Sequence, residues 1–305
     1  MEDNKIRVGI TQGDINGVGY EVILKTFAES TMLELCTPIV YGSPKVAAYH
    51  RKALDLPTNF SIVESAESAV PDRLSIVNCS DDEVKVEFAN PSAEAGHAAL
   101  AALEKAVEEY KKGFIDVIVT APINKHTIQS NEFHFPGHTE YIEQALGEGE
   151  KALMILMKND FRVALVTGHI PVSKIASTIT KDLIKEKIRI FHRSLKLDFG
   201  IGAPRIAVLS LNPHAGDEGL LGTEEQDVIV PAMTEAGEEG MLCFGPFPVD
   251  GFMGAGSFSH FDGILAMYHD QGLAPFKALA MDEGVNFTAG LPVVRTSPAH
   301  GTAYD

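Results

Sequence analysis

Three histidines follow apolar, strand-like runs of this sequence and together could bind a divalent metal ion. They stand just beyond the ends of these runs: His169 after 163–167, His214 after 207–211 and His269 after 264–268. In open α/β sheets ligands bind outside the carboxyl ends of the strands, so we expect all three at one edge of a sheet. Neutral imidazole is the commonest protein ligand of Zn²⁺ and similar metals, and Asp250 or Asp270 could add an oxygen ligand. The separations between the histidines match no short metal-binding motif. Roles as strand caps or loop hydrogen-bond partners therefore stay open.

A second candidate site is an anion site at the start of a helix expected over 140–146. His138 and Thr139 precede this helix, and Thr139 is a candidate N-cap. Backbone N–H groups and the positive end of the helix dipole suit a phosphate or carboxylate. Lys277 and Arg295 are cations in polar, Gly-rich surroundings, and a guanidinium can bind phosphate through two parallel hydrogen bonds. An ordinary capped helix and solvated surface charges are the alternatives.

The segment Thr11–Gly19 joins the first strand to the first helix. Its glycines stand at positions 13, 17 and 19, which fits neither the dinucleotide fingerprint nor a phosphate-binding P-loop. A tight strand-to-helix turn is the favoured interpretation. The sequence also has no G-x-S-x-G motif, and its three cysteines lack a local catalytic signature.

Strand-like and helical segments alternate along the chain, which predicts an α/β fold with a largely parallel sheet. Strands are expected at 7–10, 38–41, 115–120, 152–157, 162–167, 205–211 and 263–268, and further helices at 20–27, 44–53, 93–112, 181–195 and 224–235. No linker or repeat separates them, so a second domain should be interwoven with the first.

Composition narrows the class of protein. The chain has 305 residues and a formal net charge of −17, so it lacks the basic surface that a nucleic-acid-binding protein needs. No apolar run approaches the about 18 residues of a membrane span, and the acidic start does not resemble a secretory signal. Three widely spaced cysteines are typical of a reducing cytoplasm. An anionic substrate would need local cations, because the overall charge repels it.

Several segments together resemble the 4-hydroxythreonine-4-phosphate dehydrogenase family, NAD-dependent enzymes of pyridoxal 5′-phosphate (vitamin B6) biosynthesis. The resemblance extends from Ile10 to Asp305. The segments that carry it are Gly137-His138-Thr139-Glu140, Leu211-Asn212-Pro213-His214-Ala215-Gly216, Gly245-Pro246-Phe247-Pro248-Val249-Asp250, Tyr268-His269-Asp270-Gln271-Gly272, Val285-Asn286, Arg295-Thr296-Ser297 and His300-Gly301-Thr302-Ala303.

The resemblance implies two α/β/α lobes that share a mixed, mostly parallel sheet, as in isocitrate and isopropylmalate dehydrogenases. The first lobe would comprise 1–125 plus 276–305, on the cofactor side. The second would comprise 126–275, on the metal and dimer side. A cytoplasmic homodimer with its active site at the subunit interface is implied, with no nucleic acid or membrane partner.

The implied reaction oxidises 4-phosphohydroxy-L-threonine with NAD or NADP and a divalent metal (Zn²⁺, Mg²⁺ or Co²⁺), and loss of CO₂ then gives 3-amino-2-oxopropyl phosphate. By resemblance, the metal ligands are His169, His214 and His269, drawn from both subunits. The substrate-binding residues are His138, Thr139, Lys277, Asn286 and Arg295, and the cofactor loop is His300, Gly301, Thr302 and Ala303. Lys277, Asp250 and Asp270 are the candidate catalytic residues, with the proton acceptor open between Lys277 and Asp250.

Two departures from the family pattern qualify this expectation. The first turn reads Asp14-Ile15-Asn16-Gly17-Val18-Gly19-Tyr20-Glu21, where the family usually has Pro-Ala-Gly-Ile-Gly-Pro-Glu after the acidic residue. Relatives continue beyond the position of Asp305 through a cofactor loop and a final helix, so either a tail follows or the cofactor site is incomplete.

Three other functions stay open. One is a dehydrogenase of the same mechanism acting on D-threonate or D-erythronate 4-phosphate. Another is a transferase of the phosphate acetyltransferase type, which would not need three histidines. The third is a non-catalytic relative that binds a metal or ligand.

Overall fold

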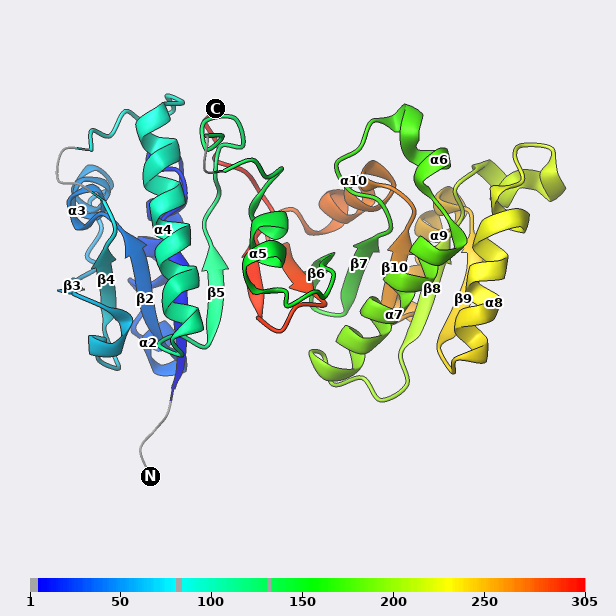
Figure 1. Ribbon diagram of the computed structural model, residues 1–305, viewed down its shortest axis with the longest axis horizontal. Coiled ribbons are helices and arrows are strands. Elements are labelled where there is room, and N and C mark those ends of the chain that lie inside the picture. The colour runs from blue at the N-terminus through cyan, green and yellow to red at the C-terminus, as the bar shows by residue number, and fades with distance from the viewer. Residues whose placement is uncertain (1–4, 81–83, 131–132, 305) are drawn as a thin grey trace. The chain divides into compact units, whose positions relative to one another are not determined.

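The computed structural model describes residues 5–80, 84–130 and 133–304. The chain divides into two compact units: Met1–Gly149 with Pro292–Asp305, and Glu150–Leu291. Both units combine β-strands with covering helices (Figure 1). In the described part of the chain, no helix has the length and apolarity needed to cross a membrane.

The strands of the first unit pair in parallel, in the order β3-β4-β2-β1-β5-β12. Its strands are β1 (Ile6–Thr11), β2 (Cys36–Gly42), β3 (Phe60–Val63), β4 (Leu74–Asn78), β5 (Val117–Thr120) and β12 (Arg295–Pro298). Its helices are α1 (Gly19–Thr26), α2 (Ser30–Leu35), α3 (Pro44–Ala53), α4 (Ala93–Lys111) and α5 (His138–Leu146), with a 3₁₀ turn η1 (Ala66–Ser68).

Helix α4 packs on β1 and β2 (Figure 1), and its buried residues are mostly alanines together with Leu100, Leu103 and Val107. Ser92 caps its N-terminus by accepting a hydrogen bond from the Ala95 N–H at 3.1 Å, and Gly113, with φ of 73°, follows its C-terminus. A Cβ on Gly96 would lie 2.0 Å from the Thr127 carbonyl oxygen, so only glycine allows this approach. These features match the predicted helix over 93–112.

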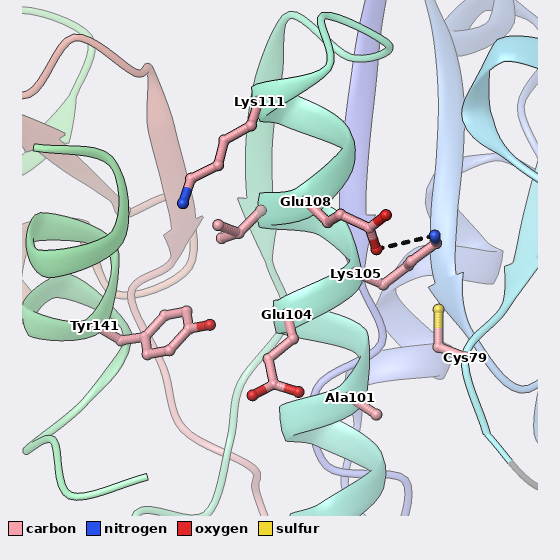
Figure 2. Close-up of a pocket in the computed structure, with 8 residues that line it drawn as sticks. Cys79, Ala101, Glu104, Lys105, Glu108, Lys111 and Tyr141 are labelled. Carbon is pink, nitrogen blue, oxygen red and sulfur yellow. Dashed lines mark hydrogen bonds and ion pairs between the residues drawn. The ribbon is translucent and has the colours of Figure 1, made fainter. Parts of the chain in front are cut away.

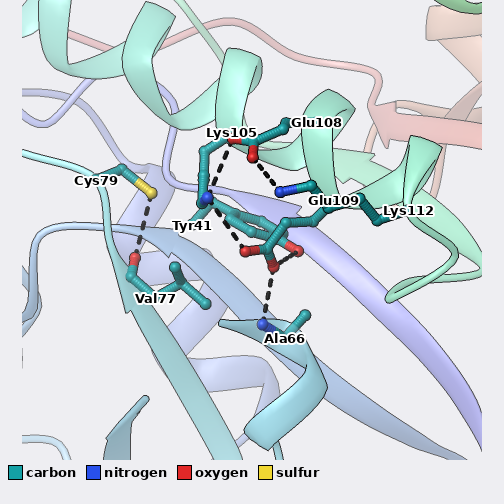
Figure 3. A network of polar contacts seen from close by, with 8 residues as sticks. All are labelled: Tyr41, Ala66, Val77, Cys79, Lys105, Glu108, Glu109 and Lys112. Atoms are coloured by element: carbon teal, nitrogen blue, oxygen red, sulfur yellow. Dashed lines mark hydrogen bonds and ion pairs between the residues drawn. The ribbon is translucent and has the colours of Figure 1, made fainter. Parts of the chain in front are cut away.

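A buried carboxylate ties α4 to the rest of this unit (Figure 3). Glu109 is 1% exposed and accepts hydrogen bonds from the Tyr41 hydroxyl at 2.9 Å and the Ala66 N–H at 2.8 Å. Lys105 lies 3.4 Å from its other oxygen. Burial, and then the charge of Glu109, raises the pKa of Tyr41, so the phenol stays protonated and serves as a donor.

The second unit has a mixed sheet in the order β11-β6-β7-β10-β8-β9. β6 runs antiparallel to β11 and β7, and the remaining pairs are parallel. The strands are β6 (Leu153–Lys158), β7 (Phe161–Leu165), β8 (Arg205–Leu209), β9 (Leu242–Phe247), β10 (Gly263–Ala266) and β11 (Val285–Ala289). The helices are α6 (Ile175–Thr178), α7 (Lys181–Leu197), α8 (Val230–Glu238), α9 (Val249–Gly254) and α10 (His269–Ala280), with short turns η2 (Val172–Lys174), η3 (Pro213–Gly219), η4 (Glu225–Ile229) and η5 (Ser257–His260).

Helix α7 supplies much of the core of the second unit. Ile184, Ile188, Phe191 and Leu195 recur at helical spacing and are fully buried. A Cβ on Gly263 would lie 2.3 Å from the Phe191 ring, so the glycine lets this helix pack closely on β10.

The predicted α/β class with a mixed, mostly parallel arrangement is confirmed. The helix expected over 224–235 is instead a five-residue π segment, η4, followed by α8. Strands β3, β4, β9, β11 and β12 were not predicted. β3 and β9 are partly exposed along their length, so neither reads as a fully buried strand.

The unit boundaries differ from the lobe boundaries expected at 125/126 and 275/276. Helix α5 packs on α4, which places 126–149 with the first unit. Helix α10 packs on β7 and β10, and β11 pairs with β6, which places 276–291 with the second. Side-chain packing of this kind is not visible in the pattern of apolar residues.

Candidate active site

His169 and His269 lie side by side in the second unit because their strands are parallel neighbours. β7 pairs with β10, and the pairing continues beyond the strands, with the Val166 N–H donating to the Ala266 carbonyl at 2.8 Å. The two imidazole rings lie 5.2 Å apart between centroids. The expected meeting of histidines at strand ends therefore holds for this pair.

Asp270 orients the ring of His269. Its Oδ1 lies 2.7 Å from His269 Nδ1. When Nδ1 carries the proton and donates to this carboxylate, the lone pair of Nε2 is left for a metal ion, an arrangement common around metal-bound histidines. The two imidazoles are donors of the kind that divalent transition metals prefer, and Asp270 supports one of them.

His214 lies exposed on η3, the turn that follows β8. Among the described residues no three His, Cys, Asp or Glu side chains gather as a metal-binding group. The structure therefore brings together two of the three predicted metal ligands. Asp250, the other predicted oxygen donor, is exposed in the first turn of α9.

In the first unit, Arg295 and Thr139 meet although they are far apart in sequence. Arg295 is 3% exposed at the start of β12. Its Nε and Nη2 donate to the Thr120 hydroxyl at 3.1 and 2.6 Å, and its Nη1 donates to the Thr139 hydroxyl at 3.3 Å. Burial lowers the pKa of Arg295 to about 10, so the guanidinium stays charged at neutral pH. A buried cation at the first turn of α5 suits an anionic group.

The expectation that Thr139 caps this helix is wrong. α5 begins at His138, and Gly137 occupies the N-cap position without a side-chain cap. The Thr139 hydroxyl instead accepts the hydrogen bond from Arg295. The N–H groups of the first turn of α5 therefore receive no side-chain hydrogen-bond acceptor from the N-cap residue.

His138 is held neutral at this position. Burial, and then the charges of Arg295 and Lys125, lowers the pKa of His138 well below its usual value. A neutral imidazole can accept as well as donate a hydrogen bond. His138 is thus suited to bind a polar ligand without adding charge.

The predicted substrate residues Lys277 and Asn286 belong to the second unit. Lys277 lies in the last turn of α10. Asn286 lies on β11, and its Oδ1 is buried with no hydrogen-bond partner among the described residues. A buried orphan acceptor is costly unless something else satisfies it. This atom is therefore ready to receive an N–H or O–H donor from a ligand.

The predicted cofactor loop docks on the first turn of the chain. The Val18 N–H donates to the Thr302 carbonyl at 3.1 Å, and a Cβ on Gly17 would lie 2.7 Å from that same oxygen. Beyond the loop, the Tyr304 hydroxyl donates to Asp14 at 2.6 Å. The segment interpreted as an ordinary turn is thus the support for residues 300–303. Sequence reasoning missed both Asp14 and Tyr304, since nothing local links positions 290 residues apart.

A separate pocket of about 600 Å³ lies around α4 (Figure 2). Its lining among the described residues includes Cys79, Lys105 and Tyr141 but none of the predicted site residues. Burial raises the pKa of Cys79 to about 12, so this thiol is protonated and a poor nucleophile.

A sequence model of the family described as pyridoxal phosphate biosynthetic protein PdxA matches residues 34–305. This chain belongs to the PdxA family. The predicted family membership is therefore confirmed. PdxA relatives are named as dehydrogenases, which implies a nicotinamide cofactor.

Among the curated PdxA relatives, the 4-hydroxythreonine-4-phosphate dehydrogenase of Bacteroides thetaiotaomicron is 78% identical over 305 residues, which is all of this chain and 84% of the relative. A putative D-threonate 4-phosphate dehydrogenase of Oceanobacillus iheyensis is 36% identical, over 98% of this chain and 90% of the relative. The crystal structure of 4-hydroxythreonine-4-phosphate dehydrogenase from Klebsiella pneumoniae aligns with a TM-score of 0.85 at 31% identity, covering 100% of this chain and 92% of that one.

Proposed function

We propose that this chain is an NAD-dependent oxidoreductase that converts 4-phosphohydroxy-L-threonine to 3-amino-2-oxopropyl phosphate and CO₂ in pyridoxal phosphate biosynthesis. The observation that carries the proposal is the pair His169 and His269 at neighbouring strand ends of a PdxA-family fold. The 78% identity to a dehydrogenase named for this substrate supports the choice of substrate.

His169 and His269 of one chain are proposed metal ligands, and His214 is the proposed third ligand. A divalent ion such as Zn²⁺, Mg²⁺ or Co²⁺ would act there as a Lewis acid, lowering the pKa of the substrate hydroxyl and polarising the ketone. Asp270 keeps His269 in the tautomer that presents Nε2. This role needs no movement of Asp270.

The phosphate or carboxylate end of the substrate is proposed to bind at Arg295 and the first turn of α5. Thr120 and Thr139 fix the guanidinium in place, so little side-chain entropy is lost when the anion binds. His138 adds a neutral hydrogen-bonding group. Fixing the substrate in this way contributes to catalysis by orientation.

Asn286 is proposed to accept a hydrogen bond from a substrate N–H or O–H group through its orphan Oδ1. Lys277 or Asp250 is the proposed acceptor of the hydroxyl proton. NAD, or NADP, supplies the hydride acceptor. We propose that residues 300–303, held on the first turn by Val18, contact the adenosine side of the cofactor. The first unit is then the cofactor side, and the second unit is the metal and dimer side.

A cytoplasmic homodimer is part of the proposal, with the three histidines drawn from both subunits. Two features of the second unit support it. His214 does not join His169 and His269 in a metal-binding group within the described chain. Leu220, Leu242 and Phe244 are exposed apolar residues, the last two on the edge strand β9.

The test is NADH formation by the purified protein with one divalent metal, NAD and either of two substrates. We expect turnover of 4-phosphohydroxy-L-threonine, and loss of turnover in His269→Ala. Turnover of D-threonate 4-phosphate alone would keep the reaction type and replace the substrate. No turnover of either, with metal and NAD shown to bind, would contradict the proposal.

A further inference from the structure

The turn that carries His214 has an unusual backbone. Residues 214–218 all have positive φ, from 46° to 81°, so five consecutive residues adopt the left-handed conformation. Residues other than glycine disfavour this conformation because Cβ crowds the backbone. Such a run persists only where its surroundings hold it in place.

Glu225 holds the turn in place at its N-terminal end. It lies on η4, is 2% exposed, and directs its carboxylate toward the chain before His214. Oε1 accepts hydrogen bonds from the Leu211 and Asn212 N–H groups at 2.8 and 2.7 Å. Oε2 accepts one from the Asn212 side-chain amide at 3.0 Å. One carboxylate therefore fixes the two residues that precede Pro213.

The same carboxylate also packs against the middle of the turn. A Cβ on Gly216 would lie 2.8 Å from Glu225 Oε2 and 2.8 Å from the Gly222 carbonyl oxygen. The Leu221 N–H closes the turn by donating to the Gly216 carbonyl at 3.0 Å. Glu225 thus contacts the turn on both sides of His214 in the sequence, although it does not bond to the imidazole itself.

We propose that Glu225 is a positioning residue that fixes the direction of His214 for metal binding. The inference rests on the proposed role of His214 as a metal ligand. Groups that orient metal ligands are hydrogen-bonded and rigid, and their loss typically weakens metal binding about 10- to 100-fold. Glu225 does not bond to the ligand side chain itself, and it acts through the backbone that carries His214.

The experiment is a titration of the purified protein with Co²⁺, and the visible absorption of the bound ion measures the binding. In Glu225→Gln the side chain keeps its size but loses its charge and one acceptor. An NH₂ group then faces either the two backbone N–H groups of 211–212 or the Asn212 side-chain amide. We expect about 10-fold weaker Co²⁺ binding or more, with an altered spectrum. Asp227→Asn is the matched control, because Asp227 is exposed on the same π segment and loses the same charge.

Hydrogen exchange of the metal-free protein gives a readout that needs no metal. The amides of Leu211 and Asn212 should exchange faster in Glu225→Gln than in the wild type or Asp227→Asn. Unchanged Co²⁺ affinity in a folded Glu225→Gln protein overturns the inference, even where thermal stability falls. If Glu225→Gln does not fold, Gly216→Ala pushes on the same carboxylate, and unchanged Co²⁺ binding in that variant likewise overturns it.

His214→Ala separates this inference from the proposed function. Loss of Co²⁺ affinity in His214→Ala with normal binding by Glu225→Gln would leave the metal site standing and reject the positioning role. Normal Co²⁺ binding by His214→Ala would instead reject His214 as a ligand, and the role of Glu225 with it.

Discussion

His169 and His269 stand 100 positions apart in the sequence, yet their rings lie 5.2 Å apart between centroids. Parallel pairing of β7 with β10 produces this meeting, since it aligns the carboxyl ends of the two strands. One substitution tests whether the pair serves a metal ion. In Asp270→Asn the partner of His269 Nδ1 loses its charge, so we expect about 10- to 100-fold weaker Co²⁺ binding, measured by titration. Asp282→Asn, an exposed site beyond the same helix, should bind as the wild type does.

Arg295→Lys tests the anion site. Lysine keeps the charge but cannot bond Thr120 and Thr139 while also presenting a planar fork. We expect KM for the phosphorylated substrate to rise about 10- to 100-fold, equivalent to about 1.4–2.8 kcal/mol, with a smaller change in kcat. Steady-state kinetics measure this. Arg193→Lys, at an exposed arginine, is the control, and an unchanged KM in Arg295→Lys would remove this residue from the substrate site.

Stability should fall as the pH drops below about 6.5, the usual pKa of an unfolded histidine. The pKa of His138 is lowered in the folded protein, so below this pH the unfolded state binds the extra proton and is favoured. The slope contributed by one such group reaches about 1.4 kcal/mol per pH unit. Urea unfolding between about pH 5.5 and about pH 7.5, about one unit on either side of that pKa, should show a shallower dependence of stability on pH for His138→Asn than for the wild type. An equal slope would contradict the assignment. His50, whose pKa burial also lowers, contributes the same background to both proteins.

Tyr304→Phe removes the hydroxyl that joins the end of the described chain to Asp14. Burial, and then the hydrogen bond to Asp14, raises the pKa of Tyr304, so the group is a donor at every physiological pH. We expect NAD affinity to fall by about 5- to 10-fold, since a lost hydrogen bond to a charged group is worth about 1.5 kcal/mol or somewhat less when partly exposed. Calorimetric titration with NAD measures it. Tyr49→Phe, at an exposed tyrosine, should bind NAD normally.

Glu109→Gln tests the network that holds α4. One oxygen of Glu109 accepts both hydrogen bonds, and the amide oxygen of Gln can keep them. The amide NH₂ would then face Lys105 in place of a carboxylate oxygen. We expect this loss to lower the free energy of unfolding by about 1–3 kcal/mol. Glu108→Gln, a half-exposed carboxylate on the same helix that pairs with Lys105 and Lys112, should lower it much less, because exposed ion pairs contribute little to stability. Urea unfolding of both variants provides the comparison.

Patterns in the sequence predicted the strands and helices that periodic apolar residues mark. They missed the features that depend on contacts between residues far apart in the chain. Apolar runs located β7 and β10, and the polar residues after them located His169 and His269. The orientation of Arg295 toward Thr120 depends on pairing between β5 and β12, which no periodicity reveals. The left-handed turn after Pro213 was also missed, because four of its five residues are not glycine and give no signal for positive φ. The Asn-Pro-His-Ala-Gly segment indicated the position of this turn but not its left-handed backbone conformation.

The pairing of Arg295 with Ile118 has a consequence for the order in which the chain folds during its synthesis. The second unit is continuous, Glu150–Leu291, and all of its strands leave the ribosome before β12 does. The first unit begins earlier but lacks the strand beside β5 until residues 295–298 emerge. Closing a loop of this length is entropically slow. The unit translated first should therefore be completed last, and β5 should present an unpaired edge to chaperones and neighbouring nascent chains in the interval.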